Sequence, residues 1–297
     1  MRLQDLSAAV LVVLIWGVNF SAIKIGLQEL PPILFSALRF VVVAIPAVFF
    51  VPFPGKSWLP ILGVGIFLGV LKFTLLFVAM QSEADAGIAS LLLQAQVFFT
   101  IFIGVLLFKE KLHTVQILGL LLAGAGFSCF LFSGEHVSLL GLGLLLLAAF
   151  CWSVANLIMK QLQQVNLVHF MVWVSLVPPI PLALLSYFLE NDSPFTLIRN
   201  TQLSTWLSLA YVGYLSTLVA FALWGNLLNR YATAKVTPFA LLVPVVGVTT
   251  ANILFGETLS AFERLGATFI FAALVFTVFG NNLLGLIKEK NRALFYR

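Results

Sequence analysis

The chain has 297 residues, of which 61% are hydrophobic and 9% charged, and its mean hydropathy is +1.10. Soluble proteins carry roughly a quarter charged residues, so this composition excludes a soluble globular domain. The net charge of +5 does not indicate a nucleic-acid-binding protein, because the basic residues are scattered over short loops and form no patch.

Apolar runs of membrane-spanning length follow one another along the chain, separated by short loops rich in turn-forming residues. About 20 apolar residues cross a bilayer as a helix, which satisfies its own backbone hydrogen bonds in lipid. The first run follows Arg2 as in a signal peptide, but it lacks a small-residue cleavage site, so we interpret it as the first span. The sequence predicts an all-α integral membrane protein with ten helices: residues 5–27, 33–52, 58–80, 87–108, 114–132, 139–159, 168–189, 205–228, 235–255 and 263–286.

The basic residues divide unevenly between the two sides of such a bundle. Eleven of the 16 Lys and Arg residues fall on the side of the N-terminus, and five fall on the other side or within the membrane. Because positively charged loops stay in the cytoplasm, we expect both termini to be cytoplasmic.

One motif occurs twice, 147 residues apart. Leu107–Leu112 and Leu254–Leu259 both follow the pattern L-F-x-E-x-L, and a Leu-Gly pair stands at the same distance after each. The opening helices repeat a Trp and a Lys in the same way, at residues 16 and 24 and at residues 152 and 160. The pattern predicts two five-helix repeats, residues 1–134 and 135–297. Since five is odd, the second repeat enters the membrane from the opposite side, an architecture of many secondary transporters.

Lys72 is the first candidate for a substrate-binding residue. It lies more than two turns from either end of the third expected helix, where a charge costs roughly 3 kcal/mol or more. A charge at that depth usually faces a wet cavity, so we expect Lys72 to attract a carboxylate or another anionic group. The alternative is that it extends toward the interface or pairs with a backbone carbonyl.

Two Trp/Asn pairs are further candidates. Trp16 and Asn19 share a face of the first helix, and Trp152 and Asn156 share a face of the sixth. One interpretation is a pair of symmetry-related contacts on a central site, and the other is helix packing.

The fourth and eighth helices supply the remaining candidates. Gln94 and Gln96 lie on different faces of the fourth helix, so we expect one to line a cavity and the other to join two helices by hydrogen bonding. In the eighth helix Tyr214 and Trp224 are expected to line an opening.

Glu110 and Glu257 belong to the repeated motif and have an expected structural role. Each stands between two helices, where a carboxylate can meet the free N–H groups at the start of the following helix. In the ninth helix, Pro238 and Pro244 are expected to break or kink the helix and to free carbonyl groups.

Three other basic residues have simpler interpretations. Arg39 is expected to pair with Glu29 or Glu83 at the outer surface, and Lys24 and Lys160 are expected to be interface anchors.

The sequence contains no motif for ATP binding, serine hydrolysis or zinc proteolysis. The three histidines are on separate loops or helix ends, and Cys129 and Cys151 lie within apolar runs, so we expect no metal site, no disulfide and no cofactor. All eleven acids fall in loops or helix ends. These observations weigh against an enzyme.

The sequence resembles the EamA family of the drug/metabolite transporter superfamily. The resemblance rests on the Trp-Gly-Val-Asn-Phe opening, the Leu-Arg-Phe of the second helix, the Leu-Gln-Ala-Gln-Val-Phe-Phe-Thr stretch of the fourth helix and the repeated Glu motif. Within the family the likeness is greatest to bacterial inner-membrane exporters of O-acetylserine and cysteine, although Lys72 belongs to no motif of that family. The resemblance implies ten helices in two inverted repeats around a central cavity, in the bacterial inner membrane.

We therefore predict a secondary transporter that exports small amino acids or amino-acid-derived metabolites by alternating access. The substrate would be a zwitterionic or anionic small molecule, and the glycine pairs give only weak evidence for a dimer, so we expect a monomer or weak homodimer in lipid. The alternatives are an exchanger of sugar phosphates or nucleotide sugars, and a membrane receptor or enzyme that does not transport.

Overall fold

The computed structural model describes residues 1–54, 58–109, 114–162, 165–190, 194–231, 236 and 239–295. Within these ranges the chain is helical, and its one extended pairing is an isolated antiparallel bridge between Ala84 and Val137. The elements are α1 (Leu3–Gly26), α2 (Pro32–Val48), α3 (Trp58–Val64), the π-helix η1 (Gly65–Lys72), α4 (Phe73–Ser82), α5 (Ala86–Leu92), α6 (Ala95–Phe108), α7 (Thr114–Ser133), α8 (Leu139–Lys160), α9 (Leu167–Val174), α10 (Pro179–Leu189), α11 (Pro194–Asn200), α12 (Leu203–Ala210), the π-helix η2 (Tyr211–Val219), α13 (Ala220–Arg230), α15 (Val243–Phe255) and α16 (Ala261–Phe295).

Eight helical segments among the described residues are long and apolar enough to cross a membrane. Several of them run through consecutive elements, as Trp58–Ser82 runs through α3, η1 and α4. The apolar helices α2 and α15 are shorter and lie where the sequence predicts the second and ninth spans. An all-α, multi-pass membrane protein is thereby confirmed, and the count of ten spans stays a prediction.

Apolar side chains occupy both the interior and the outer surface of the bundle. Phe35 and Phe170 are fully buried, whereas Phe50, Phe132 and Leu139 are 86%, 76% and 73% exposed. In water such a surface would be costly to expose. In a bilayer it faces acyl chains that are equally apolar.

Irregular backbone recurs at the spacing of the repeated motif. The left-handed residues Lys109 and Gly256, with φ of 51° and 70°, end α6 and α15 at equivalent positions of the two motifs. The π-helices η1 and η2 interrupt the third and eighth spans, and π turns are frequent at functional sites. The helix of the fourth span is interrupted by a turn between α5 and α6, and the ninth has a turn just before Pro244, which lies in the first turn of α15. Pro238 and Glu110 lie outside the described residues.

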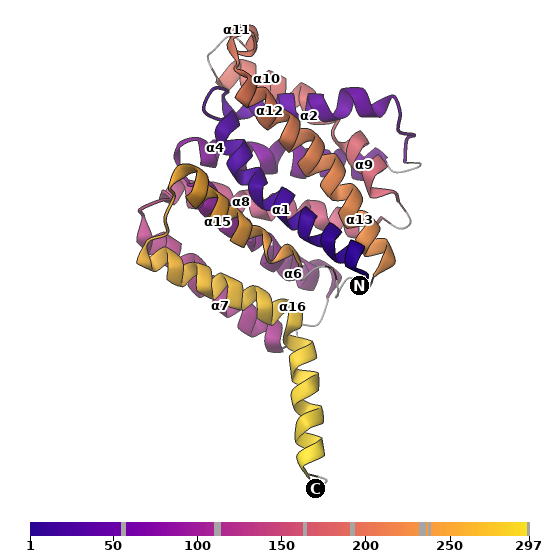
Figure 1. Ribbon diagram of the computed structural model, residues 1–297, viewed down its shortest axis with the longest axis vertical. Coiled ribbons are helices and arrows are strands. Elements are labelled where there is room, and N and C mark those ends of the chain that lie inside the picture. Colours follow the sequence, from indigo (N-terminus) through magenta and orange to yellow (C-terminus); the bar gives the residue numbers. More distant parts are fainter. Residues whose placement is uncertain are drawn as a thin grey trace.

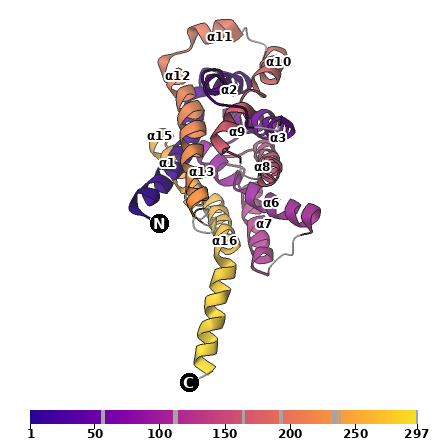
Figure 2. The same ribbon diagram turned by 90° about the vertical axis from the view of Figure 1, so that its right-hand side faces the viewer.

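The helices α7 and α16 lie side by side along one edge of the bundle, and α16 continues beyond it to the C-terminus (Figure 1). In the view turned by 90°, this extension leaves the bundle at the end opposite α11 (Figure 2). The two helices meet through glycines: a Cβ at Gly126 would stand 2.8 Å from Ile270 Cγ1 and 3.0 Å from the Gly266 carbonyl oxygen. Small residues of this kind let two backbones approach closely in a membrane.

A first prediction concerns this glycine contact. Gly126→Leu should lower the free energy of unfolding by about 1–3 kcal/mol, because overpacking forces α7 and α16 apart. Gly124→Leu is a matched control on the same helix, since nothing lies within 4 Å of a Cβ at Gly124. Thermal unfolding in detergent micelles measures both variants, and equal losses of stability would contradict the close packing at Gly126.

Candidate functional site

Lys72 is buried in the middle of the third span, as the last residue of η1. Its side chain is 5% exposed, and Nζ lies 3.5 Å from the centroid of the Phe73 ring and 4.8 Å from that of Trp152. Among the described residues it makes no ion pair and no hydrogen bond. Aromatic faces attract a desolvated cation, but they do not neutralise it.

Arg39 is also buried, which corrects the expectation that it pairs with an acid at the outer surface. Glu29 instead accepts hydrogen bonds from Gln202 N and Thr205 Oγ1, and Glu83 accepts one from the Ser138 hydroxyl. Arg39 is 3% exposed and lies on α2, whose first turns are packed inside the bundle. A position early in a helix is therefore not a surface position here.

The contacts of Arg39 place it next to Lys72. Its Nη2 donates to Thr217 Oγ1 on η2 at 2.9 Å, and its Cζ lies 3.8 Å from the centroid of the same Phe73 ring that Lys72 contacts. Its Nε and Nη1 are buried, and neither has a hydrogen-bond partner among the residues that the structure describes. Sequence analysis did not place Arg39 beside Lys72. The signal that could have indicated a buried Arg39 is that it is the single charged residue of an otherwise apolar second helix.

The two predicted Trp/Asn pairs have different partners. Trp16 donates from Nε1 to the Ser216 carbonyl oxygen at 3.1 Å, and its ring packs against Phe221 and Trp224 with centroids 5.5 and 5.3 Å away. Asn19 is 8% exposed, and its Oδ1 has no hydrogen-bond partner in the described part of the chain. The structure thus brings Trp16 and Trp224 together, whereas Trp152 contacts Lys72.

The two glutamines of the fourth span also separate, because the helix breaks between α5 and α6. Asn156 Nδ2 on α8 donates to Gln96 Oε1 on α6 at 2.7 Å, so Gln96 joins two helices, as one of the two glutamines was expected to do. Gln94 is buried and makes a long contact, 3.5 Å, with the Ala240 carbonyl oxygen. Tyr214 is 38% exposed on η2 and takes no part in these contacts.

A groove of about 470 Å³ opens near the start of α9 and the first two turns of α13. Its lining includes Phe221, which packs against Trp16 and stands about one helical turn from Thr217, the partner of Arg39. The groove thus follows the helical segment that continues from Thr217, but neither Arg39 nor Lys72 is among its lining residues. It is lined by Val165, Asn166, Leu167, Val168, Phe221, Ala222, Gly225 and Asn226.

Glu257 lies at the opposite end of α1 from this groove. Near the groove, Tyr231 and Arg230 at the end of α13 bond Asp5 at the start of α1. At the other end of α1, Lys24 Nζ contacts Glu257 Oε1 at 2.6 Å and Asp85 Oδ1 at 3.5 Å. Lys24 is thus an ion-paired residue, where a simple interface anchor was expected.

The carboxylate of Glu257 also accepts hydrogen bonds from Ala86 N at 3.1 Å and Gly87 N at 2.9 Å. These are the first N–H groups of α5, so Glu257 meets a helix start as predicted, but the helix comes from the first half of the chain and is not the one that follows Glu257. The following helix, α16, has its own acid in its first turn, Glu263.

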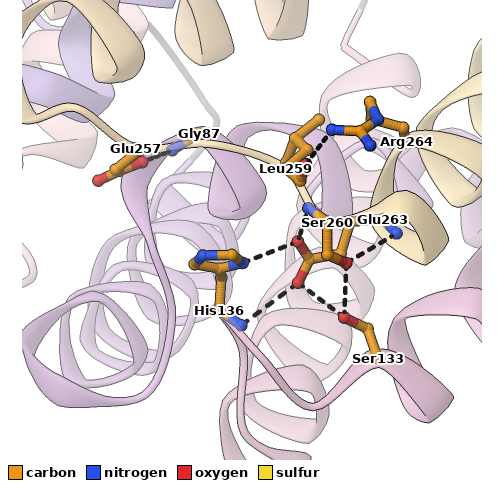
Figure 3. A network of polar contacts seen from close by, with 8 residues as sticks. All are labelled: Gly87, Ser133, His136, Glu257, Leu259, Ser260, Glu263 and Arg264. Atoms are coloured by element: carbon orange, nitrogen blue, oxygen red, sulfur yellow. Dashed lines mark hydrogen bonds and ion pairs between the residues drawn. The ribbon is translucent and has the colours of Figure 1, made fainter.

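Glu263 is the centre of a polar network that joins the loop at residues 133–136 to the start of α16 (Figure 3). The residue is fully buried and accepts from Ser260 N at 2.8 Å, Ser133 Oγ at 3.1 Å and His136 N at 3.3 Å, and it lies 2.9 Å from His136 Nδ1. Ser260 and Glu263 form a capping box, a sequence signal that could have identified this cap. The hydrogen bond to Glu263 raises the pKa of His136 above its ordinary value of 6.5, although partial burial opposes the shift.

Comparison with known proteins is decisive for the family. The model of the EamA-like transporter family matches residues 5–132 and 139–279. The chain belongs to the EamA-like transporter family. It is a transporter by family and not an enzyme, as the missing catalytic motifs predicted.

Two relatives of the EamA-like chain are each described as a probable amino-acid metabolite efflux pump. The protein of Salmonella typhimurium is 40% identical over 288 residues, covering 94% of this chain and 96% of the relative. That of Escherichia coli K12 is 39% identical over 290 residues, with the same coverage. A solved crystal structure aligns with a TM-score of 0.65 at 19% identity, covering 95% of this chain and 99% of the other, and is similar in fold.

A second prediction concerns Glu257. Glu257→Gln should lower stability by about 1.5–3 kcal/mol, the range for hydrogen bonds to a charged group, because it weakens both the cap of α5 and the pairing with Lys24. Substrate affinity should change little. The exposed Glu135→Gln is the control, and loss of affinity at full stability would instead place Glu257 in the binding site.

A third prediction concerns pH and His136. A raised pKa in the folded state means that the charged imidazole stabilises the fold fully below about pH 6.5, the unfolded value, and that this contribution is lost as pH rises through the folded pKa. The stability difference between wild type and His136→Asn should therefore shrink upward from pH 6.5 in thermal unfolding. Glu263→Gln should remove most of that dependence, and a difference that is constant with pH would contradict the pairing.

Proposed function

We propose that this chain is a secondary transporter that exports small amino acids or amino-acid-derived metabolites by alternating access. The observation that carries the proposal is Lys72, a buried cation without an acidic partner in the middle of a span. A substrate carboxylate supplies the missing negative charge. The description of two relatives as probable amino-acid metabolite efflux pumps supports this substrate class.

The proposed alternation uses two inverted five-helix halves, residues 1–134 and 135–297. The recurrence of the left-handed caps and the π-helices at the spacing of the repeated motif supports it, as do the family matches over residues 5–132 and 139–279. The groove and the Lys24–Glu257 ion pair lie at opposite ends of α1. We propose that the groove is the entry from the cytoplasm and that the contacts of Glu257 close the outer end. During export the contacts of Glu257 would open and the groove would close.

We also propose that the chain lies in the bacterial inner membrane with both termini in the cytoplasm, on the evidence of the eleven-to-five bias of Lys and Arg. A single cysteine placed at residue 135 or 191 should then react with an impermeant reagent outside the cell. One placed at 111 or 290 should react only after the membrane is opened, with Cys129 and Cys151 replaced beforehand. External labelling at 111 would overturn both the helix count and the inverted repeat.

The central experiment measures transport of a labelled panel of amino acids and derivatives by the purified protein in liposomes. Lys72→Gln should lower substrate affinity about tenfold or more, because a charge-assisted contact is worth roughly 1.5–3 kcal/mol. The exposed Arg264→Gln is the control for loss of a charge elsewhere. Unchanged affinity in a folded Lys72→Gln variant would exclude Lys72 from the site, and no transport of any compound in the panel would exclude the proposed function.

The same variant tests how transport is driven. If Lys72 is a fixed charge, Lys72→Gln weakens substrate binding and leaves any response to an imposed pH gradient intact. If Lys72 carries the coupled proton, the variant also loses uphill transport while downhill exchange remains. We favour the fixed charge, since the described residues hold no carboxylate within hydrogen-bonding reach of Lys72 to relay a proton.

A further inference from the structure

Arg39 and Lys72 come from different spans and lie against one aromatic ring. Lys72 Nζ is 3.5 Å and Arg39 Cζ 3.8 Å from the centroid of the Phe73 ring, so the two groups are at most 7.3 Å apart. Like charges in an apolar interior repel, and taking each out of water is costly. Such an arrangement is stabilised when an anion enters it.

The acids whose contacts are described bind other groups. Glu29, Glu83 and Glu190 bond groups on other elements, and Glu257 and Asp5 are paired with Lys24 and Arg230. The buried oxygens without a partner in the described residues belong to Asn19, Ser36 and Thr74, and all three are neutral. Among the described residues, Arg39 and Lys72 therefore have no acidic partner.

The guanidinium of Arg39 has a free edge. Its Nη2 donates to Thr217, while Nε and Nη1 are buried and have no hydrogen-bond partner among the described residues. Nε and Nη1 lie on different edges of the guanidinium, and one N–H of Nη2 completes each edge. The edge that Thr217 does not use can therefore match the two oxygens of a carboxylate, which is the geometry of strong bidentate pairing. Thr217 thus acts as a positioning residue that fixes the orientation of the Arg39 guanidinium.

We infer that Arg39 and Lys72 form one binding site for a carboxylate with net negative charge, so that the preferred substrates are amino-acid derivatives without a free ammonium group. The inference rests on the proposed function and narrows its substrate class. The carboxylate of a zwitterion brings one negative charge, as that of any monocarboxylate does, but the zwitterion also brings an ammonium group, two bonds from the carboxylate carbon, that is held close to the two cations. An N-acyl, 2-oxo or 2-hydroxy acid keeps the carboxylate and avoids that repulsion.

The test uses matched pairs that differ only at the amine. Alanine, N-acetylalanine and lactate compete for transport of a labelled substrate by the wild-type protein in liposomes. We expect N-acetylalanine and lactate to compete at least tenfold more strongly than alanine. Stronger competition by alanine would overturn the inference while leaving the proposed export of amino acids in place, whereas absence of any transport would count against the proposed function itself.

Variants then assign the preference to Arg39. Arg39→Gln should weaken competition by the anionic compounds at least tenfold and remove the preference over alanine, and Arg39→Lys should restore part of it. Thr217→Val should weaken competition by all three compounds and keep the preference, since the charge remains. If Arg39→Gln still prefers the anionic compounds over alanine, the assignment of that preference to Arg39 is wrong. If the variant does not fold, the competition measured with the wild-type protein still tests the inference. If inorganic phosphate competes and N-acetylalanine does not, the inference that the site binds a carboxylate would be wrong, and a phosphate ester would be the favoured substrate.

Discussion

Lipid offers no hydrogen-bond partner and no counter-ion, and the described part of this protein is organised around that constraint. Each break in a helix exposes N–H groups that must be satisfied within the chain. Carboxylates do this at several helix starts: Glu190 binds the N–H groups of Ile33 and Leu34, Glu257 those of Ala86 and Gly87, and Glu263 that of Ser260. In the first two cases the acid comes from a distant segment, so capping also fixes how the helices assemble.

The same constraint separates the two signs of charge. The acids with described contacts lie at helix ends and are occupied by N–H groups, hydroxyls or basic side chains. Two cations, Arg39 and Lys72, are left in the interior with aromatic rings and one hydroxyl as their partners among the described residues. This imbalance is unfavourable for folding alone, because nothing in the described chain neutralises it. It becomes intelligible when an anionic molecule is the missing partner, and it is the strongest argument for a binding site at this place.

Irregular helices place these cations. Lys72 ends one π-helix, and Thr217, the partner of Arg39, lies on the other. The wider turns change which side chains face inward, and they occur at nearly the same spacing as the repeated Glu motif. The groove lies beside α13 toward one end of α1, while Lys24 and Glu257 are ion-paired at the other end. An open groove and an ion pair toward opposite ends of one helix agree with the alternating access proposed above.

The sequence by itself determined the all-helical membrane class, the approximate places of the apolar helices, the doubled motif and the depth of Lys72, because bilayer thickness and the cost of charge act on each segment independently of its neighbours. It did not determine that Arg39 is buried beside Lys72, that Gln96 meets Asn156, or that Glu257 caps α5. In a soluble protein the apolar stripe of a helix identifies its buried face. Here the lipid-facing side is as apolar as the core, as the exposure of Phe50 and Phe132 beside buried Phe35 illustrates, so periodicity does not say which faces meet. Only the packing of the helices against one another decided those contacts.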